Sequence, residues 1–179
     1  MKATALEIPE VILFKPKFVA DERGFFFESF NQRQIEAAAG RALSFVQDNH
    51  SRSTKGVLRG LHYETQQPHG KLVRVVQVYD VAVDIRRSSP TFGKWGAGVL
   101  GAENSSQLWG PESLAHGFVA LSQTAKFRYK TNDYYASVHE RFLLWEDKAL
   151  GIEWPINDKP MLSPKDAQAP MLGVAEVFA

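Results

Sequence analysis

The sequence predicts an all-β fold in which many short strands close into a jelly roll, with one or two short helices. Three observations support this: Val-rich alternating segments, turn-forming clusters of Gly, Pro, Asn and Ser between them, and sparse helical signals. Closure into a barrel or a double-sheet jelly roll is expected because it removes exposed strand edges. The 179 residues contain no internal repeat, linker or low-complexity tract, so residues 1–179 are expected to form one domain.

Strands are expected where apolar and polar residues alternate. In AKFRYKTN, Tyr129 shares the apolar face of the segment, so it is predicted to point inward while the neighbouring cations point outward. In chain order, the expected strands are VILF (11–14), SFVQ (44–47), GVLRGLHY (56–63), KLVRVVQVYDVAVDIR (71–86), QLW (107–109), HGFVAL (116–121), AKFRYKTN (125–132) and RFLLW (141–145).

Two segments carry helical signals. FNQRQIEAAAG has a polar start, an Ala run and a terminating Gly40, which predicts about two turns. Ser163 and Asp166 have the spacing of an N-terminal cap with Pro164 at the first helical position, which predicts a single turn.

The composition excludes several classes of protein. A net charge of +1 gives no electrostatic case for nucleic-acid binding, despite the aromatic and cationic YKTNDYY. The absence of Cys excludes disulfides, thiolate metal sites and a Cys nucleophile. No apolar run approaches the roughly 20 residues of a membrane span, and the N-terminus lacks the pattern of a signal peptide. A cytoplasmic protein without membrane partners is therefore expected.

The stretch VLRGLHYETQQPHGKLVRVV places two histidines between candidate strands. A metal site could use His62, Glu64 and His116, because alternate strand residues share a face and can converge on one ion. A general-base site could use His62, with Lys71 returning across the turn toward a developing oxyanion. His69 is expected to be exposed in the loop. The spacing alone leaves both kinds of site open.

Other motifs have a structural and a functional interpretation. DERGFFFES is either a strand with a buried aromatic residue or an anion-recognising Arg23 beside Glu28 and an aromatic stacking surface. VQDNHS is a turn by default, although its amides could contact a polar ligand. His116, taken alone, resembles a hydrogen-bonded core histidine. Walker, G-x-G-x-x-G and G-x-S-x-G motifs are absent, which removes the commonest phosphate-loop and serine-hydrolase interpretations.

Taken in order, these pieces resemble the dTDP-4-dehydrorhamnose 3,5-epimerase family of the cupin superfamily. The resemblance is carried by DERGFFFESFN, FVQDNHSRS, VLRGLHY, GKLVRVV, DVAVDIRRSSPTFGKW, ENSSQLW, AHGF, YKTNDYY, GIEWP and LSPKDA. It implies a homodimeric, cupin-like jelly roll (double-stranded β-helix). It also implies a reaction that inverts C3 and C5 of dTDP-4-dehydro-6-deoxy-D-glucose to give dTDP-4-dehydro-L-rhamnose, in dTDP-L-rhamnose biosynthesis. No cofactor or metal is implied, because both carbons adjoin the C4 ketone and can lose a proton through an enolate.

The resemblance also implies residue roles. His62 matches the base, Asp166 the carboxylate paired with it, Lys71 the partner of the enolate oxygen, and Tyr129 the acid on the opposite face. The residues that it assigns to substrate binding are Arg23, Glu28, Gln47, Asp48, Asn49, Arg59, His116, Glu140 and Lys165. Part of DERGFFFE is expected to cross the dimer interface, so Arg23 or Glu28 would serve the neighbouring subunit.

The chain departs from the family pattern at three places. The usual Gly-containing turn is missing where Gln77 runs into Val78, so a hairpin there would have to shift or its two strands would have to merge. Ser113 stands where Gly is usual, and Gly110 where an apolar residue is common. These two changes are expected to reshape the loop before His116.

Three alternatives remain beside the double epimerase. A relative that inverts only C3 or only C5, or that isomerises the keto group of a related dTDP-deoxysugar, would share the fold and most motifs. A metal-dependent cupin oxygenase would need a bound metal. A non-catalytic sugar-nucleotide binding module would keep the arginines but would need no base.

Overall fold

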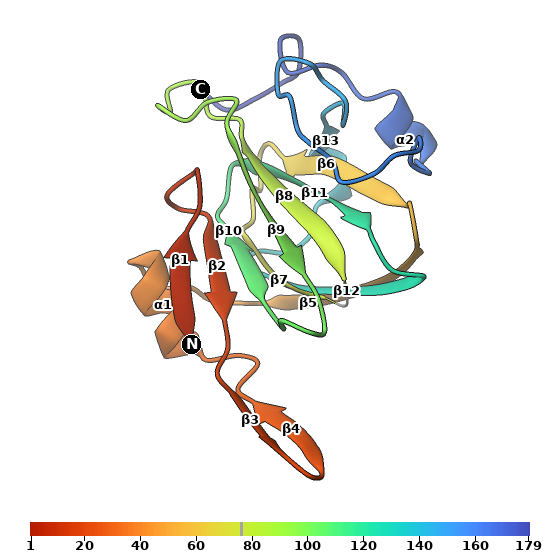
Figure 1. Ribbon diagram of the computed structural model, residues 1–179. Helices are drawn as coiled ribbons and strands as arrows, with labels where there is room; N and C mark the ends of the chain where they lie inside the picture. The colour runs from red at the N-terminus through yellow and green to blue at the C-terminus, as the bar shows by residue number, and fades with distance from the viewer. Residues whose placement is uncertain (76) are drawn as a thin grey trace.

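Two β-sheets form the body of the protein. The structure, a computed structural model, describes residues 1–75 and 77–179. Within this part of the chain, a six-stranded and a five-stranded sheet face each other, and a separate hairpin projects from one end (Figure 1). Together with two short helices, this arrangement confirms the predicted all-β jelly roll.

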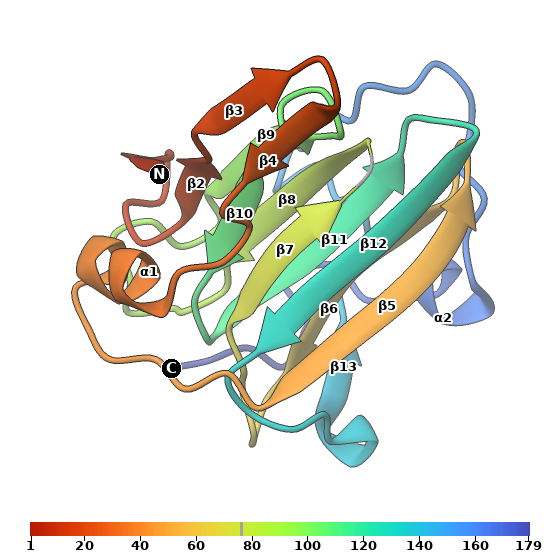
Figure 2. The ribbon, with the colours of Figure 1, turned by 90° about the horizontal axis from the view of Figure 1, so that it is seen from below.

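The first sheet runs in the order β1-β2-β10-β7-β12-β5 and the second in the order β13-β6-β11-β8-β9. The first consists of β1 (Lys2–Ala5), β2 (Ile12–Lys15), β10 (Gln107–Gly110), β7 (Lys71–Val75), β12 (Thr124–Thr131) and β5 (Gln47–Thr54). The second consists of β13 (Glu140–Phe142), β6 (Leu58–Glu64), β11 (Leu114–Ala120), β8 (Val78–Asp84) and β9 (Trp95–Leu100). In Figure 2 the strands β7, β12 and β5 lie in front of β8, β11 and β6.

The main core lies between these sheets. Phe127 of the first sheet stacks on Phe118 of the second, with ring centroids 4.0 Å apart. Val73 and Leu108 from the first sheet and Ala82 from the second are fully buried in the same cluster. Burial of these side chains follows the alternation expected of strands and is the main source of stability.

Helix α1 (Gln32–Ala39) covers the outer face of the first sheet. Its Ile35 is fully buried in a cluster with Phe14 and Trp109. The side chain of Asn31 caps the N-terminus, and Gly40 ends the helix at a φ of 69°. The helix predicted from FNQRQIEAAAG is therefore confirmed.

The C-terminal third of the chain covers the outer face of the second sheet, where Leu143, Leu150 and Leu172 pack in one cluster with residues of β8. This part includes the 3-10 turn η1 (Ser137–His139) and helix α2 (Pro164–Ala167). The Ser163 side chain caps α2, as predicted. Among the described residues, neither helix has the length and apolar character required to cross a membrane.

The expectation for residues 71–86, a shifted hairpin turn or two merged strands, is wrong. Strands β7 and β8 belong to different sheets, so the chain crosses from one sheet to the other instead of turning back on itself. Gln77 has a φ of 53°, the positive value for which a glycine was expected. Position 76, which precedes Gln77, lies outside the described residues.

The projecting hairpin consists of β3 (Phe18–Asp21) and β4 (Gly24–Phe27). Its aromatic residues are not buried, contrary to the structural interpretation of DERGFFFES: Phe25 is 65% exposed and Phe26 is 74% exposed. The hairpin contacts little of its own chain and extends away from the body (Figure 1).

Candidate active site

A cavity between the two sheets is lined by His62, Lys71 and Tyr129, three of the four predicted catalytic residues. Strands β6, β11 and β13 line one side, and β5, β7 and β12 line the other. Its volume is about 400 Å3, which suits a small organic ligand. It is lined by Asn49, His50, Ser51, Arg59, His62, Lys71, His116, Gly117, Phe118, Phe127, Tyr129, Tyr135 and Glu140.

His62 is held by a residue from a distant part of the chain. β6 places it at the cavity wall with 30% of its side chain exposed, and its Nε2 lies 2.5 Å from Oδ1 of Asp166. Asp166 is buried in α2, where the Ser163 hydroxyl donates a hydrogen bond to its Oδ2 at 2.8 Å. Burial alone would raise the pKa of Asp166, but hydrogen bonds from His62 and Ser163 outweigh it and lower this pKa below 3.8. The charged carboxylate therefore orients the imidazole.

Tyr129 and Lys71 reach the cavity from the sheet opposite His62. The predicted inward orientation of Tyr129 is confirmed, and its ring packs against Phe127. Lys71 begins β7, with its Nζ 5.9 Å from the centroid of the Tyr129 ring. Burial raises the pKa of Tyr129 above its ordinary 10.0, so the phenol keeps its proton at neutral pH. A phenolic acid and an amine therefore face an imidazole across the cavity.

Glu64 and Asp80 are buried acids near Lys71. Burial lowers the pKa of Lys71, and the negative charges of Glu64 and Asp80 oppose that shift. Burial also raises the pKa of Asp80 well above 3.8. Sequence reasoning considered Glu64 only as a metal ligand and did not select Asp80, because nothing in DVAVDIR distinguishes it from an exposed strand residue.

His116 lies in β11, paired in register with His62 of β6. It is buried, and burial together with the neighbouring charge of Lys71 keeps its pKa well below 6.5, so the imidazole is neutral. Its Nδ1 lies 3.6 Å from Oδ1 of Asp80. Gly110 lies against the ring, since an added Cβ there would be 3.1 Å from its Nε2.

Ser113 occupies the left-handed region in the same loop, with a φ of 67°. This is the conformation that favours glycine, and it explains why the family pattern has Gly at this position. Ser113 adopts this conformation in place of glycine, and the predicted change in the loop before His116 stays a prediction.

The predicted turn at residues 47–49 is wrong, because these residues begin strand β5. The strand alternates, so Asn49 lines the cavity and accepts a hydrogen bond at 2.9 Å from Gln47. Asp48 points to the opposite face, where its carboxylate pairs with Lys130 at 2.9 Å. The structure therefore does not bring Asp48 into this cavity. Arg59 does line it.

Arg23 and Glu28 lie away from the cavity of their own chain. Arg23 is at the tip of the β3–β4 hairpin, 90% exposed and paired with Asp21. Glu28 accepts a hydrogen bond from Gln34 at 3.0 Å. Lys165 is 70% exposed on α2, but its Nζ lies 3.6 Å from Oε2 of Glu140, which lines the cavity.

His69 is not the exposed loop residue that the sequence suggested. Only 6% of its side chain is accessible, and its Nδ1 lies 3.6 Å from Oε1 of Glu64. Burial and the charge of Lys71 lower the pKa of His69 to about 4, so its imidazole is neutral. The Pro-His-Gly context resembled a solvated turn, whereas tertiary packing covers it.

Tyr135 also lines the cavity and was not selected from the sequence. The two adjacent tyrosines of YKTNDYY gave no signal that separates it from Tyr134, and both are exposed, Tyr134 to 61% and Tyr135 to 50%. For the metal interpretation, the described residues contain no group of three or more His, Cys, Asp or Glu side chains that could hold a metal ion.

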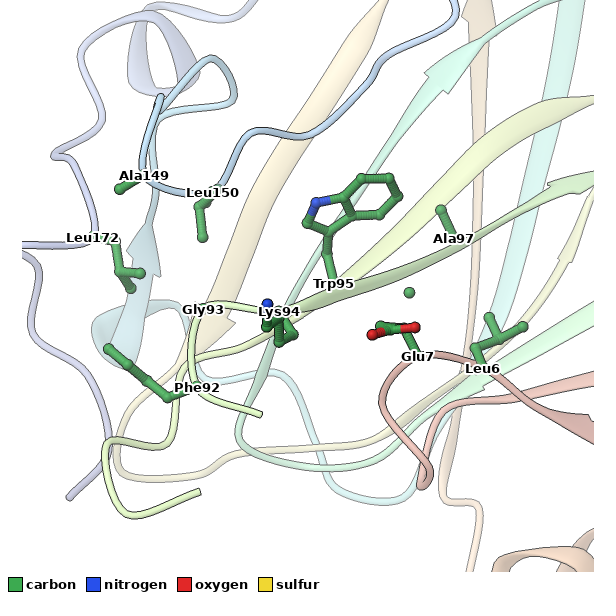
Figure 3. A pocket seen from close by; sticks show the side chains of 11 residues that line it. Leu6, Glu7, Phe92, Gly93, Lys94, Trp95, Ala97, Ala149, Leu150 and Leu172 are labelled. Atoms are coloured by element: carbon green, nitrogen blue, oxygen red, sulfur yellow. The ribbon is translucent and has the colours of Figure 1, made fainter. Parts of the chain in front are cut away.

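A larger cavity of about 740 Å3 lies elsewhere on the protein (Figure 3). Trp95 and Lys94 lie between Leu6 on one side and Leu150 on the other. None of the site residues predicted from the sequence lines it. Size alone therefore does not identify the reactive site, whereas the facing acid and base do.

Comparisons with known proteins agree with this geometry. The family described as dTDP-4-dehydrorhamnose 3,5-epimerase matches residues 5–173. The chain is 57% identical to the Pseudomonas aeruginosa dTDP-4-dehydrorhamnose 3,5-epimerase, over 99% of both chains. It superposes with a TM-score of 0.93 and 49% identity on the Legionella pneumophila dTDP-6-deoxy-D-glucose-3,5-epimerase in complex with dTDP-4-keto-L-rhamnose, covering 97% of this chain and 93% of that one.

A Streptomyces bikiniensis 3'-monoepimerase in complex with dTDP-quinovose is also similar. Its TM-score is 0.86 at 31% identity, over 94% of this chain and 87% of that one. Three findings lead to one conclusion. The family matches residues 5–173, the two relatives above are 57% and 49% identical to the chain, and a cavity lies between the sheets. The chain belongs to the dTDP-4-dehydrorhamnose 3,5-epimerase family.

Proposed function

We propose that the protein inverts C3 and C5 of dTDP-4-dehydro-6-deoxy-D-glucose and so produces dTDP-4-dehydro-L-rhamnose. One observation carries this proposal: His62 lies on one sheet and Tyr129 on the other, and both line the same cavity. Inversion of a carbon requires that a proton leave from one face and return to the other. A base and an acid on opposing sheets meet that requirement.

The proposed reaction uses the C4 ketone of the sugar. His62 takes the proton from the adjacent carbon through the ring nitrogen that is not bonded to Asp166. The electron pair moves into the enolate, whose oxygen is stabilised by the ammonium of Lys71. Tyr129 then donates its phenolic proton to the opposite face of the carbon. Before the second inversion, the partly exposed His62 releases the abstracted proton to water and the Tyr129 phenolate takes up a proton from water in the same cavity.

Substrate binding is proposed for the polar residues around this centre. Arg59 at the cavity wall suits the diphosphate, and Asn49 and Gln47 suit the polar groups of the nucleotide. Lys165 and Glu140 form a pair at the rim.

We further propose a homodimer in which the β3–β4 hairpin enters the neighbouring subunit's site. Its aromatic residues Phe25 and Phe26 are 65% and 74% exposed. Arg23 lies exposed at the tip, where it pairs with Asp21 of the same hairpin. In this arrangement Arg23 of the hairpin would join Arg59 of the other chain in binding the diphosphate.

The test is turnover in D2O. Solvent deuterium at both C3 and C5 of the product is expected, while His62→Ala should abolish turnover and leave dTDP affinity within about threefold. Full activity of His62→Ala would exclude this mechanism.

Activity should also be unchanged by EDTA, whereas a metal-dependent oxygenase would lose its activity.

A second candidate is an enzyme that inverts a single carbon, because the similar Streptomyces bikiniensis protein is a 3'-monoepimerase. Deuterium at one carbon alone would select it. Tyr129 does not separate these two candidates, because inversion of a single carbon also requires a proton from the opposite face.

A further inference from the structure

A second, much smaller cavity lies beside Lys71. Its volume is about 10 Å3, which is the space that one water molecule needs. Lys71 lines both this cavity and the active-site cavity. The polar side chains around it include Glu64, His69 and His116.

Two buried ring nitrogens border this space. Within the described part of the chain, Nδ1 of His69 and Nε2 of His116 are buried without a hydrogen-bond partner. Both side chains are only 6% exposed. Nε2 of His116 faces Gly110, which lines the cavity, since an added Cβ there would lie 3.1 Å from that nitrogen. A buried polar atom without a partner costs free energy, so a bound partner is favoured here.

The chemistry of these groups fits one water molecule. Both imidazoles are neutral, so each carries one nitrogen that accepts a hydrogen bond; with the proton on Nε2 of His69 and on Nδ1 of His116, the two unpartnered nitrogens are the acceptors. A water can donate to both nitrogens and accept from the Lys71 ammonium, which gives the three hydrogen bonds that are typical of a buried water. A larger ligand would not fit the volume.

We infer that this cavity binds a structural water that links His69 and His116 to Lys71, which makes His69 a positioning residue for the amine at the enolate oxygen. The catalytic consequence of this inference rests on the proposed function, whereas the water site is independent of it. By accepting a hydrogen bond from the ammonium, the water favours the protonated form of Lys71.

Several other charged or titratable groups also face Lys71. They are Glu64 of β6, Asp80 of β8, His116 of β11, Tyr129 of β12 and Glu140 of β13. Variants that leave all of these in place isolate the contribution of the water.

A high-resolution crystal structure tests the site without any assay. A density peak within hydrogen-bond distance of His69 Nδ1, His116 Nε2 and Lys71 Nζ is expected in the wild-type protein. In Gly110→Ala the added methyl group should displace it. A wild-type cavity that is empty, or closed by side-chain movement, would overturn the inference.

The pH dependence of kcat tests the consequence. His69→Leu and Gly110→Ala should each shift the basic limb to lower pH by about one unit, with KM changed less than about twofold, because Lys71 then loses its proton more readily. His69→Gln keeps an acceptor and should restore most of the wild-type profile. If His69→Leu and His69→Gln behave alike, His69 does not act through a water.

Failure of the two proposals can be separated. If the wild-type protein does not turn over the dTDP-sugar, the proposed function fails, and the crystallographic result still decides the water site. If His69→Leu does not fold, as judged by circular dichroism, the comparison of Gly110→Ala with the wild type decides the kinetic effect.

Discussion

Asp166 contacts His62 from 104 residues further along the chain, and only 3% of its side chain is exposed. Its carboxylate stays charged in this buried position because His62 and Ser163 both bond to it. An amide would keep the size of the side chain but could present an N–H to the imidazole instead of an acceptor. The imidazole would then lose its preferred tautomer.

Asp166→Asn is therefore expected to lower kcat by on the order of a thousandfold while dTDP affinity changes little. Steady-state kinetics and calorimetric titration with dTDP measure the two effects. The matched control is Asp158→Asn, which alters an exposed residue and should retain wild-type kinetics. A loss of less than about fivefold in Asp166→Asn would show that the carboxylate is not needed to orient the base.

His69 makes stability depend on pH. Its pKa falls from 6.5 in the unfolded chain to about 4 in the folded protein. Between these two values the unfolded chain binds a proton at His69 that the folded protein does not. The contribution of His69 to the unfolding free energy is therefore complete above pH 6.5 and is lost as the pH falls toward 4.

Between pH 7 and pH 4.5 the wild-type protein should lose about 2 kcal/mol more unfolding free energy than His69→Gln. Urea denaturation at both pH values measures this. His50→Gln, at an exposed histidine, is the control and should retain the wild-type pH dependence. If the unfolding free energy changed by the same amount between these pH values in the wild type and in His69→Gln, the burial of His69 would be contradicted.

At the scale of elements, β6 and β11 approach each other more closely than side chains would allow. A Cβ added to Gly60 would lie 2.5 Å from the Cα of Gly117, and Gly60 has a φ of 132°. The register of the two strands shifts between His116 and Phe118, next to this contact. The two glycines therefore fix how β6 presents His62 opposite β11.

Gly60→Ala should lower the unfolding free energy by about 3 kcal/mol, because backbone cannot move aside as a flexible side chain can. Thermal or urea denaturation measures the loss. Gly173→Ala is the matched control, since an added Cβ there meets no atom within 4 Å, and it should cost less than about 0.5 kcal/mol. Similar values for the two variants would exclude a tight strand contact.

For the whole molecule, the proposed homodimer places Arg23 in the site of the neighbouring subunit. Within one chain Arg23 is exposed at the end of the projecting hairpin, whereas His62 lies in the cavity between the sheets. If the hairpin serves a neighbouring subunit, each site contains His62 from one chain and Arg23 from the other.

This arrangement predicts complementation between two inactive variants. Coexpressed His62→Ala and Arg23→Ala chains should form mixed dimers with one intact site, and random pairing gives about a quarter of wild-type activity. Each variant expressed alone should have little activity. A coexpressed mixture that stays as inactive as the separate variants would place Arg23 in its own chain's site, or outside any site.

Much of the fold could be predicted because its signals are local. The alternation of AKFRYKTN placed Tyr129 inward, and the caps around Asn31 and Ser163 placed both helices, since these patterns act within one strand or one turn. The resemblance then indicated His62, Lys71 and the distant carboxylate. Strand pairing was not predictable, because it joins segments far apart in the chain.

The sequence by itself determined the strand periodicity, the helix ends, the family and the residues that are proposed for the reaction. Only the tertiary structure decided that β7 and β8 lie in different sheets, that Asp48 faces away from the cavity, and that His69 is buried behind Lys71. The physical reason is that the charge and hydration of a side chain depend on what packs around it. For Lys71 of β7 those neighbours include Glu64 of β6, Asp80 of β8 and Glu140 of β13, which approach it only when the two sheets close.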